Sequence, residues 1–438
     1  RGEIMNLISM PSYGPLNDWT WMTSHWKGTP GVAWPGGTIK QALGAELHTM
    51  NPYNEDTLYG WQMLDRAIPG LLSIDPTTLL DMPFVATNWS LASWTSIPEL
   101  GIVNGSTATF YLRQDVYWQD GEPVTAYDCV NNMRLLRKYR PGRYSTTWSN
   151  LVYEEADGPY KFNVYFFTPS LLWLPSVAGT ALLSPKHITD LAEAKYGSIL
   201  TGWDPAFTNY KDLTGVDPPA KYSFMKQIVG CGPFVFDYFD KSVQRGRAVK
   251  YDEFFVSAPV IGSVVGDWRI EPGAAYTYRT LVQNIAAKND SESGELVPVT
   301  VDVKVYEEDV LKHSETGITL DPWEWQYLGP YTTSALSGGN HTLKVEVYEG
   351  GNLIHTYVHK LVATLRADVT TYSGDKLDFK IDIADVYRAA KAFGSTAKDA
   401  ADFTPAGRRW EPAADLNDDF KVNIKDMYEI AKKFGWHI

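Results

Sequence analysis

The sequence predicts an α+β chain of several domains: a mixed α/β lobe over residues 37–262, a β-sandwich over 263–367 and a small pair of helical repeats over 368–438. Its length of 438 residues is the first reason, because a single hydrophobic core stops growing at roughly 250–300 residues. A change of hydrophobic period to two near residue 263 is the second, and an internal repeat in the last segment is the third. Residues 1–36 form a Trp-rich, irregular segment that ends in Pro and Gly breakers.

Strand and helix patterns alternate in the lobe. The segment from Thr109 to Arg113 has the composition of a strand, and Asp120-Gly121 marks a turn. Thr125 is followed three residues later by Asp128, which is the pattern of a capping box at a helix start. Four apolar residues then recur at i, i+1, i+4 and i+7 and predict one buried helix face: Cys129, Val130, Met133 and Leu136.

The next segment has strand patterns and no helical one. Several strands over about 100 residues indicate a β-sandwich, and a β-rich part of the lobe is the alternative. His355 and His359 lie four apart within a strand pattern, where we expect exposed polar positions rather than a metal pair. Apolar and polar residues alternate along two runs, Val299, Val301, Val303 and Val305, and then Leu343, Val345 and Val347.

The last segment contains a duplicated unit. Residues 377–394 read LDFKIDIADVYRAAKAFG, and residues 418–435 read DDFKVNIKDMYEIAKKFG. The two are identical at 10 of 18 positions with an offset of 41 residues. Each unit combines an acidic loop with apolar residues at helical spacing, so the pattern predicts two loop–helix repeats.

Composition and motifs exclude several functional classes. The net charge of −13 argues against nucleic acid as a partner, because such binding depends on Lys and Arg that release counterions. The sequence contains no Gly-x-Ser-x-Gly, phosphate-loop or His-Glu-x-x-His motif, so it predicts a protein that is not an enzyme. Aromatic residues make up 13% of the chain, which suits a core, an interface or a sugar-binding cleft.

Sequons and cysteines favour an extracellular setting. We expect Cys129 and Cys231 to form a disulfide, because they are the only cysteines and lie in one lobe. Two buried thiols are the alternative, since free Cys packs well as a small hydrophobe. Four glycosylation sequons begin at Asn88, Asn104, Asn289 and Asn340.

Five ordered motifs in residues 37–260 resemble the family 5 extracellular solute-binding proteins of peptide and oligosaccharide ABC transporters. The longest runs from Phe110 to Asp128 and reads FYLRQDVYWQDGEPVTAYD, with Leu-Arg, an aromatic, Asp-Gly, Pro, Thr-Ala and Asp as in the family. Cys231 stands where the family usually has Thr. The other motifs are Gly36-Gly-Thr-Ile-Lys with Met50-Asn-Pro, then Leu71-Leu-Ser-Ile-Asp-Pro, Leu183-Ser-Pro-Lys-His and Gly230-Cys-Gly-Pro-Phe.

The resemblance implies a periplasmic-binding-protein-like lobe and a missing second lobe. In the family a second lobe follows the Gly-Thr-Gly-Pro segment, whereas strand patterns begin here directly after Phe254-Phe255. Residues 3–11 and 26–28 resemble the segment that closes the family's fold beyond that lobe. We therefore expect the other lobe upstream of Arg1, removed or on a separate chain, and this chain to be a processed part of a larger protein.

The family's loop after Asn-Pro faces the binding cleft, so the resemblance implies ligand contacts in that loop and on nearby aromatic side chains. A core position is the alternative for each Trp. The ligand-binding residues implied in this way are Asn54, Glu55, Thr57, Trp61, Trp118 and Trp148.

Two further resemblances cover the rest of the chain. Residues 263–367 resemble archaeal immunoglobulin-like adhesion modules in pattern, and residues 368–438 resemble dockerins. The motif Arg409-Trp410 with Pro412 is also similar to archaeal dockerin-like tails. An archaeal cell-surface protein is the setting that these resemblances imply.

The dockerin resemblance implies one calcium site, because Ca²⁺ takes six to eight oxygens and a loop must present them at alternating positions. Phe420 stands where the calcium loop usually has Gly. The predicted ligands are Asp415, Asn417, Asp419, the Lys421 carbonyl, Asn423 and Asp426. We expect a weaker or empty site in the earlier repeat, because its first position has no side-chain oxygen and its third is a lysine. Those equivalent positions are Gly374, Lys376, Asp378, Lys380, Asp382 and Asp385. Two packed helices with solvent-facing acidic loops are the alternative.

These observations leave two classes of function open. The first is the extracellular substrate-binding component of an ABC transporter for peptides or oligosaccharides, with a membrane permease as partner. The second is a structural or adhesive cell-surface protein that assembles with copies of itself into a sheet or filament. Under the first, we expect this chain alone to bind ligand weakly, because the second lobe closes the cleft.

Overall fold

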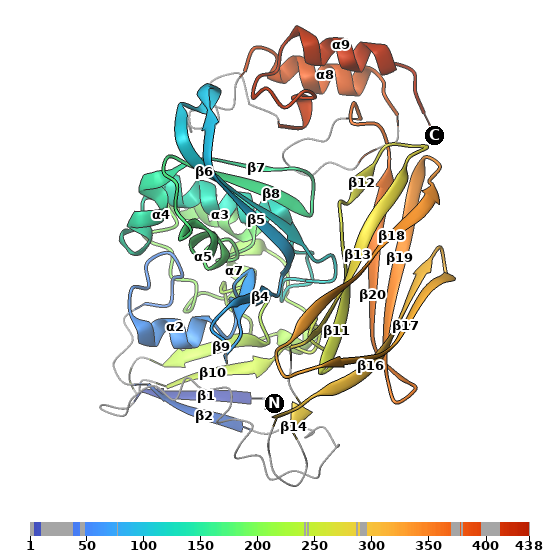
Figure 1. The fold of residues 1–438 in the computed structure, drawn as a ribbon. Coiled ribbons are helices and arrows are strands. Elements are labelled where there is room, and N and C mark those ends of the chain that lie inside the picture. Colours follow the sequence, from blue (N-terminus) through green and yellow to red (C-terminus); the bar gives the residue numbers. More distant parts are fainter. Residues whose placement is uncertain are drawn as a thin grey trace.

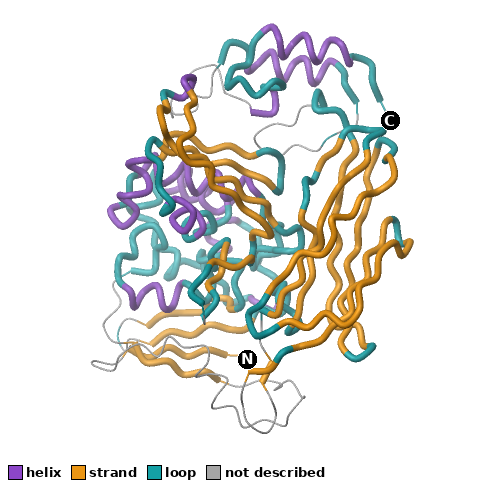
Figure 2. Tube along the Cα trace, in the orientation of Figure 1, coloured by secondary structure: helices purple, strands orange, loops and turns teal. Residues whose placement is uncertain are grey.

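The computed structural model describes residues 4–9, 38–43, 49–76, 78–240, 242, 245–285, 288–289, 296–368, 377, 380–395 and 412–437. A lobe of sheets and helices lies beside a strand-rich body, and two antiparallel helices lie across the end of both (Figures 1 and 2). The architecture is mixed α/β with substantial sheet content, as a solute-binding-protein fold requires.

The first strand of the chain lies inside a four-stranded sheet of the lobe. Strand β1 (Ile4–Ser9) pairs in parallel with β2 (Thr38–Leu43) and antiparallel with β10 (Arg245–Lys250), and β9 (Phe234–Asp240) completes the sheet. The segment expected to resemble a closing strand therefore joins the sheet of the lobe that follows it in sequence.

A second sheet of the lobe has the order β5-β6-β8-β7, and all its pairs are antiparallel. Its strands are β5 (Ala86–Ile97), β6 (Ile102–Leu112), β7 (Leu151–Ala156) and β8 (Lys161–Phe166). A small sheet pairs β3 (Leu72–Ile74) with β4 (Asp81–Pro83).

Helix α3 (Ala126–Tyr139) packs beside this sheet and begins as the sequence predicts. The Thr125 backbone N–H donates to the Asp128 carboxylate over 2.9 Å, which forms the capping box. Cys129, Val130, Met133 and Leu136 are all buried, so the predicted apolar face is confirmed. The other lobe helices are α2 (Leu58–Leu64), α4 (Ser145–Asn150), α5 (Trp173–Ala178), α6 (Lys186–Tyr196) and α7 (Tyr210–Thr214), with 3-10 turns at Pro98–Leu100, Gly142–Tyr144 and Ala220–Tyr222.

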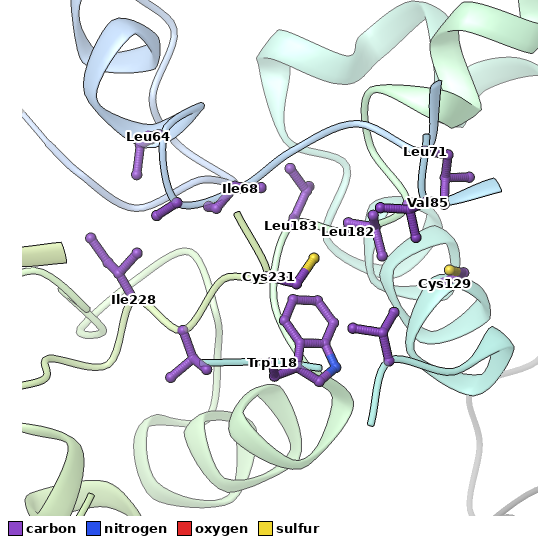
Figure 3. Close-up of a cluster of buried hydrophobic side chains, with 14 of the residues drawn as sticks. Leu64, Ile68, Leu71, Val85, Trp118, Cys129, Leu182, Leu183, Ile228 and Cys231 are labelled. Atoms are coloured by element: carbon purple, nitrogen blue, oxygen red, sulfur yellow. The ribbon is translucent and has the colours of Figure 1, made fainter. Parts of the chain in front are cut away.

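The two cysteines are free thiols in the lobe core, so the expected disulfide is wrong for this structure. Cys129 lies on the buried face of α3, and Cys231 lies in a loop beside Trp118 (Figure 3). Burial raises the pKa of both thiols, which keeps them protonated. Both side chains serve as small apolar groups in packing with leucine and valine side chains.

The strand-rich body consists of a three-stranded sheet, β11-β13-β18, and a five-stranded sheet, β12-β20-β19-β16-β17. Alternating side chains of the two sheets form one shared core, and the predicted valine run lies in β16 with all four members buried. The strands are β11 (Val260–Val265), β12 (Arg269–Ile270), β13 (Ala275–Asn284), β16 (Val299–Glu307), β17 (Val310–Leu320), β18 (Trp325–Ala335), β19 (Gly339–Glu349) and β20 (Asn352–Ala363), with a short pair β14 (Lys288–Asn289) and β15 (Leu296–Val297). The immunoglobulin-like assignment of this body stays a prediction.

His355 and His359 on β20 are buried, contrary to the expectation of exposed polar positions. The Gly262 N–H donates to His355 Nδ1 over 3.2 Å. Burial lowers the pKa of each imidazole to about 4, so both are neutral at pH 7. The expectation failed because the exposure of a strand face depends on what covers it, and here β11 and its neighbours do.

Side chains fix the strand-rich body to the lobe. The Arg113 side chain is fully buried and forms a bidentate pair with Asp115 at 2.8 Å, while also donating to the Gly262 carbonyl. The guanidinium also lies 4.8 Å from the Phe255 ring centroid and 5.3 Å from that of Tyr357. The Gly262 carbonyl and the Tyr357 ring belong to the strand-rich body, so these two contacts of the guanidinium join it to the lobe.

Two further contacts extend this junction. The Gln114 amide donates to the Lys360 carbonyl over 3.0 Å and accepts from the Lys360 N–H over 2.7 Å. Trp268 donates through Nε1 to the Asp157 carbonyl, and its ring fills the space where a Cβ on Gly158 would stand, 2.1 Å away. In both contacts a side chain of one body donates a hydrogen bond to a backbone carbonyl of the other.

The tail contains two helices, α8 (Ile383–Ala392) and α9 (Ile424–Lys433), which follow the two copies of the repeat. Each begins with a capping box, at Asp382 and at Asn423. Strands β6, β7 and β8 of the lobe, with the 3-10 turn Pro98–Leu100, share a small core with the tail. Its lobe members are Leu100, Ile102, Tyr153 and Tyr165, and its tail members are Ala367, Ile381, Ala389, Ala392, Ala414, Val422 and Ile430.

Candidate functional site

The loop before α2 is fixed by hydrogen bonds across the lobe. Asn51 donates through Nδ2 to the Ile199 and Trp203 carbonyls, at 2.8 and 3.2 Å. The neighbouring Asn54 is exposed and donates to the Leu200 carbonyl over 2.6 Å. This loop is the Asn-Pro segment from which ligand contacts were expected, and its backbone is held in place without a ligand.

Glu55 carries an unusual carboxylate in this loop. Glu55 is fully buried, and its Oε1 oxygen accepts hydrogen bonds from the Thr57 N–H and hydroxyl at 2.7 and 2.5 Å. Thr57 in turn caps α2 by accepting from the Gly60 N–H. The other oxygen, Oε2, is buried and has no hydrogen-bond partner within the described parts of the chain. A buried acceptor without a donor costs about 1–3 kcal/mol, so this carboxylate is held in the loop at some cost to stability.

Two tryptophans, Trp61 on α2 and Trp148 on α4, each have an arginine guanidinium over the indole ring. The Trp61 indole donates to the Glu55 carbonyl over 2.9 Å, and the Arg143 guanidinium lies 4.7 Å from its ring. The Trp148 indole donates to the Pro141 carbonyl, and Arg140 lies 5.6 Å from its ring. Trp61 and Trp148 are partly exposed and both arginines are exposed, so each pair offers a cationic and an aromatic group together.

Sequence reasoning missed both arginines, although the run Arg140-Pro-Gly-Arg143 precedes Trp148. A pair of arginines beside a turn in an acidic chain was the available signal. The structure brings Glu55, Trp61 and Arg143 together, through contacts that no short sequence pattern reports.

Trp118 does not belong to this surface, and its expected role as a stacking face is wrong for this structure. The side chain is about 1% exposed and lies in the lobe core (Figure 3). The Trp118 carbonyl accepts from the Tyr251 hydroxyl over 3.0 Å. The aromatic position in this motif thus serves packing, which was the alternative for each Trp.

The ordered motifs of the lobe contact one another. Asp120 accepts from the Tyr210 hydroxyl over 3.2 Å and lies 2.7 Å from His187 Nε2, which joins two motifs far apart in sequence. The Asp128 carboxylate accepts from the Lys186 N–H. Burial alone would lower the pKa of His187, but the hydrogen bond and charge of Asp120 raise it. These contacts join motifs that are far apart in sequence and hold the lobe together.

The predicted calcium loop has a closed hydrogen-bond network. Asp415 accepts from the Asp419 and Phe420 N–H groups at 3.2 and 2.7 Å. Asp426 accepts from the Leu416 and Asn423 N–H groups at 2.9 and 2.8 Å. Phe420 has φ of 60°, so the backbone at this position is the left-handed one that glycine usually provides.

Acidic groups crowd this loop. Burial and the nearby charges of Asp426 and Asp419 raise the pKa of Asp415 to about 7. A cation would relieve this repulsion, which fits the predicted ligands. In the described parts of the chain, however, no three Asp, Glu, His or Cys side chains come together as a ready metal cluster.

The remaining predicted ligands of this loop and of the earlier one differ in placement. Asn417 accepts from the Asp419 N–H, and the Lys421 N–H donates to Asp419. In the earlier repeat Asp385 is buried in a capping box, and Lys380 is exposed. Gly374, Lys376 and Asp378 of that loop lie outside the described residues.

Three of the four sequon asparagines can be placed. Asn104 and Asn340 are exposed, and Asn88 is half-buried on β5. The side chain of Asn289 lies outside the described residues. Among the helices that the structure describes, none is long and apolar enough to cross a membrane.

Comparison with known proteins supports the family 5 assignment for part of the chain. Residues 86–279 match the family model described as bacterial extracellular solute-binding proteins, family 5 Middle. The probable peptide-binding protein YejA of Agrobacterium fabrum is 28% identical over 155 residues, which cover 35% of this chain and 23% of that protein. The chain thus matches less than a quarter of the length of that relative.

Two solved structures show a more distant likeness. NikZ from Campylobacter jejuni, in complex with Ni(L-His), is 18% identical and covers 48% of this chain and 35% of its own, with a TM-score of 0.34. The CARDB domain of PF1109 from Pyrococcus furiosus is 18% identical and covers 24% of this chain and 94% of its own, with a TM-score of 0.18.

Proposed function

We propose that this chain is an extracellular part of the substrate-binding component of a peptide-type ABC transporter, with a membrane permease as its partner. The observation that carries the proposal is the α2 loop, where the partly exposed Trp61 donates to the Glu55 carbonyl and lies 4.7 Å from the exposed Arg143 guanidinium. The indole face suits an apolar or aromatic side chain of a peptide. The exposed guanidinium suits a carboxylate.

The experiment is a titration of the full chain with tri- to pentapeptides, followed by NMR or calorimetry. We expect weak binding, in the millimolar range of about 4 kcal/mol, because one lobe cannot exclude water from both sides of a ligand. Arg143→Ala should abolish it. Arg245→Ala, which removes an exposed arginine of β10, is the matched control.

Three outcomes contradict this picture. Peptide binding that survives Arg143→Ala places the ligand elsewhere. Micromolar affinity shows that the chain needs no second lobe. A response to oligosaccharides with none to peptides would retain the transport class and change the ligand, since partly exposed Trp61 and Trp148 also suit sugar rings.

A structural or adhesive surface protein is the second candidate, and the rigid junction of the three bodies favours it. Arg113 and Gln114 fix the strand-rich body to the lobe, and the tail packs back onto the lobe. A transport protein needs mobile parts around its cleft, whereas a surface scaffold needs a rigid unit. Ordered sheets or filaments of the purified chain in electron micrographs would support this candidate, and monodisperse particles at all concentrations would oppose it.

The second loop of the tail would hold one Ca²⁺ through Asp415, Asn417, Asp419, Asn423 and Asp426, with the Lys421 carbonyl. The proximity of Asp419 and Asp426 to Asp415 supports this assignment, because a bound cation would offset the repulsion among these carboxylates. Equilibrium dialysis should find one site, lost in Asp415→Asn and retained in the exposed-acid control Asp309→Asn. Absence of bound calcium at millimolar concentration would refute the assignment.

A further inference from the structure

Among the residues that the structure describes, strand β5 forms an open edge of the lobe's second sheet. It pairs with β6 along its length, and no other described strand pairs with it. Its start is covered, where the Tyr327 hydroxyl donates to the Thr87 carbonyl over 3.0 Å, and its last residue, Ile97, packs against the core shared with the tail. From Asn88 to Ser93 the pairing with β6 is regular, one residue opposite one. The outer backbone groups of this six-residue stretch form a template for another strand.

The composition of this edge lacks the features that usually protect one. No charged residue occurs between Asp81 and Glu99 in the sequence, and no proline occurs within β5. Natural edge strands are blunted by charges, prolines or covers. The edge strand β17 of this chain carries Lys312 and Glu315.

The other edge of the same sheet provides a direct comparison. Strand β7 carries Glu154 and Glu155, whereas β5 carries none. The uncharged edge strand β18 contains Pro330, which cannot donate a backbone hydrogen bond. Among the longer described edges, β5 therefore combines length, regular pairing and absence of charge.

Side chains along β5 allow close approach. Ser90 and Ala92 are small, exposed and two residues apart, so they lie on one face of the strand. At the far end Trp94 is 71% exposed at a bulge with φ of 63°, and Val103 on β6 is 74% exposed. These two apolar side chains lie at the same end of the β5–β6 hairpin, and a strand that paired with β5 there would remove them from water.

We propose that β5 pairs antiparallel with β5 of a second copy of this chain about a two-fold axis. The pairing would join the two four-stranded sheets into one continuous sheet. In such an isologous contact every residue meets its own copy or a near neighbour, so any charge on the strand would face a like charge. The absence of charge on β5 removes this obstacle, and this self-compatibility favours a second copy over an unrelated extended peptide.

The test measures self-association of the full chain by sedimentation velocity, up to about 100 μM, a concentration that detects micromolar dimers. The material is produced without N-glycans, because a glycan on Asn88 would cover the strand. We expect a dimer. The variant Ser90→Lys with Ala92→Lys, and separately Ser90→Glu with Ala92→Glu, should each weaken dimerisation about tenfold or more through like-charge contact.

Mixing the two variants provides the decisive measurement. The Lys form and the Glu form should associate with each other at least as well as the wild-type chain does with itself. Unchanged far-UV circular dichroism shows that each variant is folded. The control, Thr300→Lys with Thr319→Lys, places two charges on the exposed face of another sheet and should leave the dimer intact.

Three results would overturn the proposal. A monomer at the highest concentration is one, and a dimer unaffected by either charge pair is another. Protection of residues 88–93 from hydrogen exchange that depends on an added peptide but not on chain concentration would assign the edge to a peptide instead.

The proposal is independent of peptide binding at the α2 loop, and it supplies one contact that the structural candidate requires. A β5 dimer that forms no larger assembly would sustain the inference while opposing the filament function. Peptide titrations of the Lys and Glu variants separate it from the transport function, because neither changed residue lies in the α2 loop.

Discussion

Acidification from pH 7 to pH 5 should destabilise the strand-rich body through His355 and His359. Both side chains are buried and neutral, with pKa values lowered from 6.5 to about 4. At pH values between the folded and the unfolded pKa, the unfolded chain binds more protons than the folded one. The free energy of unfolding therefore decreases as the pH falls through this range. Each histidine contributes about 2 kcal/mol to this loss at pH 5, and the two together about 4 kcal/mol.

Other groups oppose this trend, so the assay must isolate the pair. The pKa of His187 is raised beside Asp120, which adds stability as pH falls. We therefore compare the wild-type chain with His355→Asn plus His359→Gln. Asn offers an acceptor near the Nδ1 position that takes the Gly262 N–H. Gln keeps a donor near the Asp267 carbonyl.

Urea unfolding is followed at β20 by pulse-labelling hydrogen exchange and mass spectrometry, with the labelling pulse at one fixed pH. The wild-type chain should lose about 4 kcal/mol more between pH 7 and pH 5 than the double variant. His341→Gln, which changes a histidine outside this core, should behave as the wild type. Equal pH dependence in wild type and double variant would refute the reasoning.

Three further predictions concern packing between the bodies and inside the lobe core. Arg113→Ala should cost about 3 kcal/mol in urea unfolding, since it empties a fully buried position and removes the contacts with the Gly262 carbonyl and the Tyr357 ring. A loss below about 1 kcal/mol would contradict this role. Phe420→Ala should weaken the packing of the tail on the lobe by about 1–3 kcal/mol, because the Phe420 ring packs edge-to-face on Tyr165 with 5.7 Å between the ring centroids. Faster hydrogen exchange in α8 and α9 would measure this effect, and unchanged exchange would contradict it. Cys129 and Cys231 should react with iodoacetamide only after denaturation, which intact-mass measurement detects. Modification of the native chain within minutes would contradict the burial of the thiols, and a mass lower by two hydrogens would show a disulfide.

Local patterns predicted local structure well. The capping box at Thr125, the buried face of α3 and the alternating strand that became β16 all follow from neighbours within about ten residues. The repeated loop–helix units correspond to α8 and α9 for the same reason. Such features depend on backbone geometry and periodicity, which a sequence records directly.

Exposure and pairing between bodies could not be predicted in the same way. His355 alternates on β20 as a surface residue would, and its burial depends on Gly262, 93 residues earlier. Trp118 and Cys231 meet in a core built from distant loops. In the candidate site, Trp61 and Glu55 were foreseen, but Arg143 was not, because its approach depends on where the turn after α3 places it.

The position of β1 inside its sheet affects how the chain folds during synthesis. The strand is made before its antiparallel partner β10, which comes about 240 residues later. At roughly 5–20 residues per second, this side of β1 waits about 12–48 seconds for its partner. During that interval a bare strand edge is open to other strands, including those of neighbouring nascent chains. Slower synthesis, or a holding chaperone that covers residues 4–9, should therefore change the yield of folded protein more than its final stability.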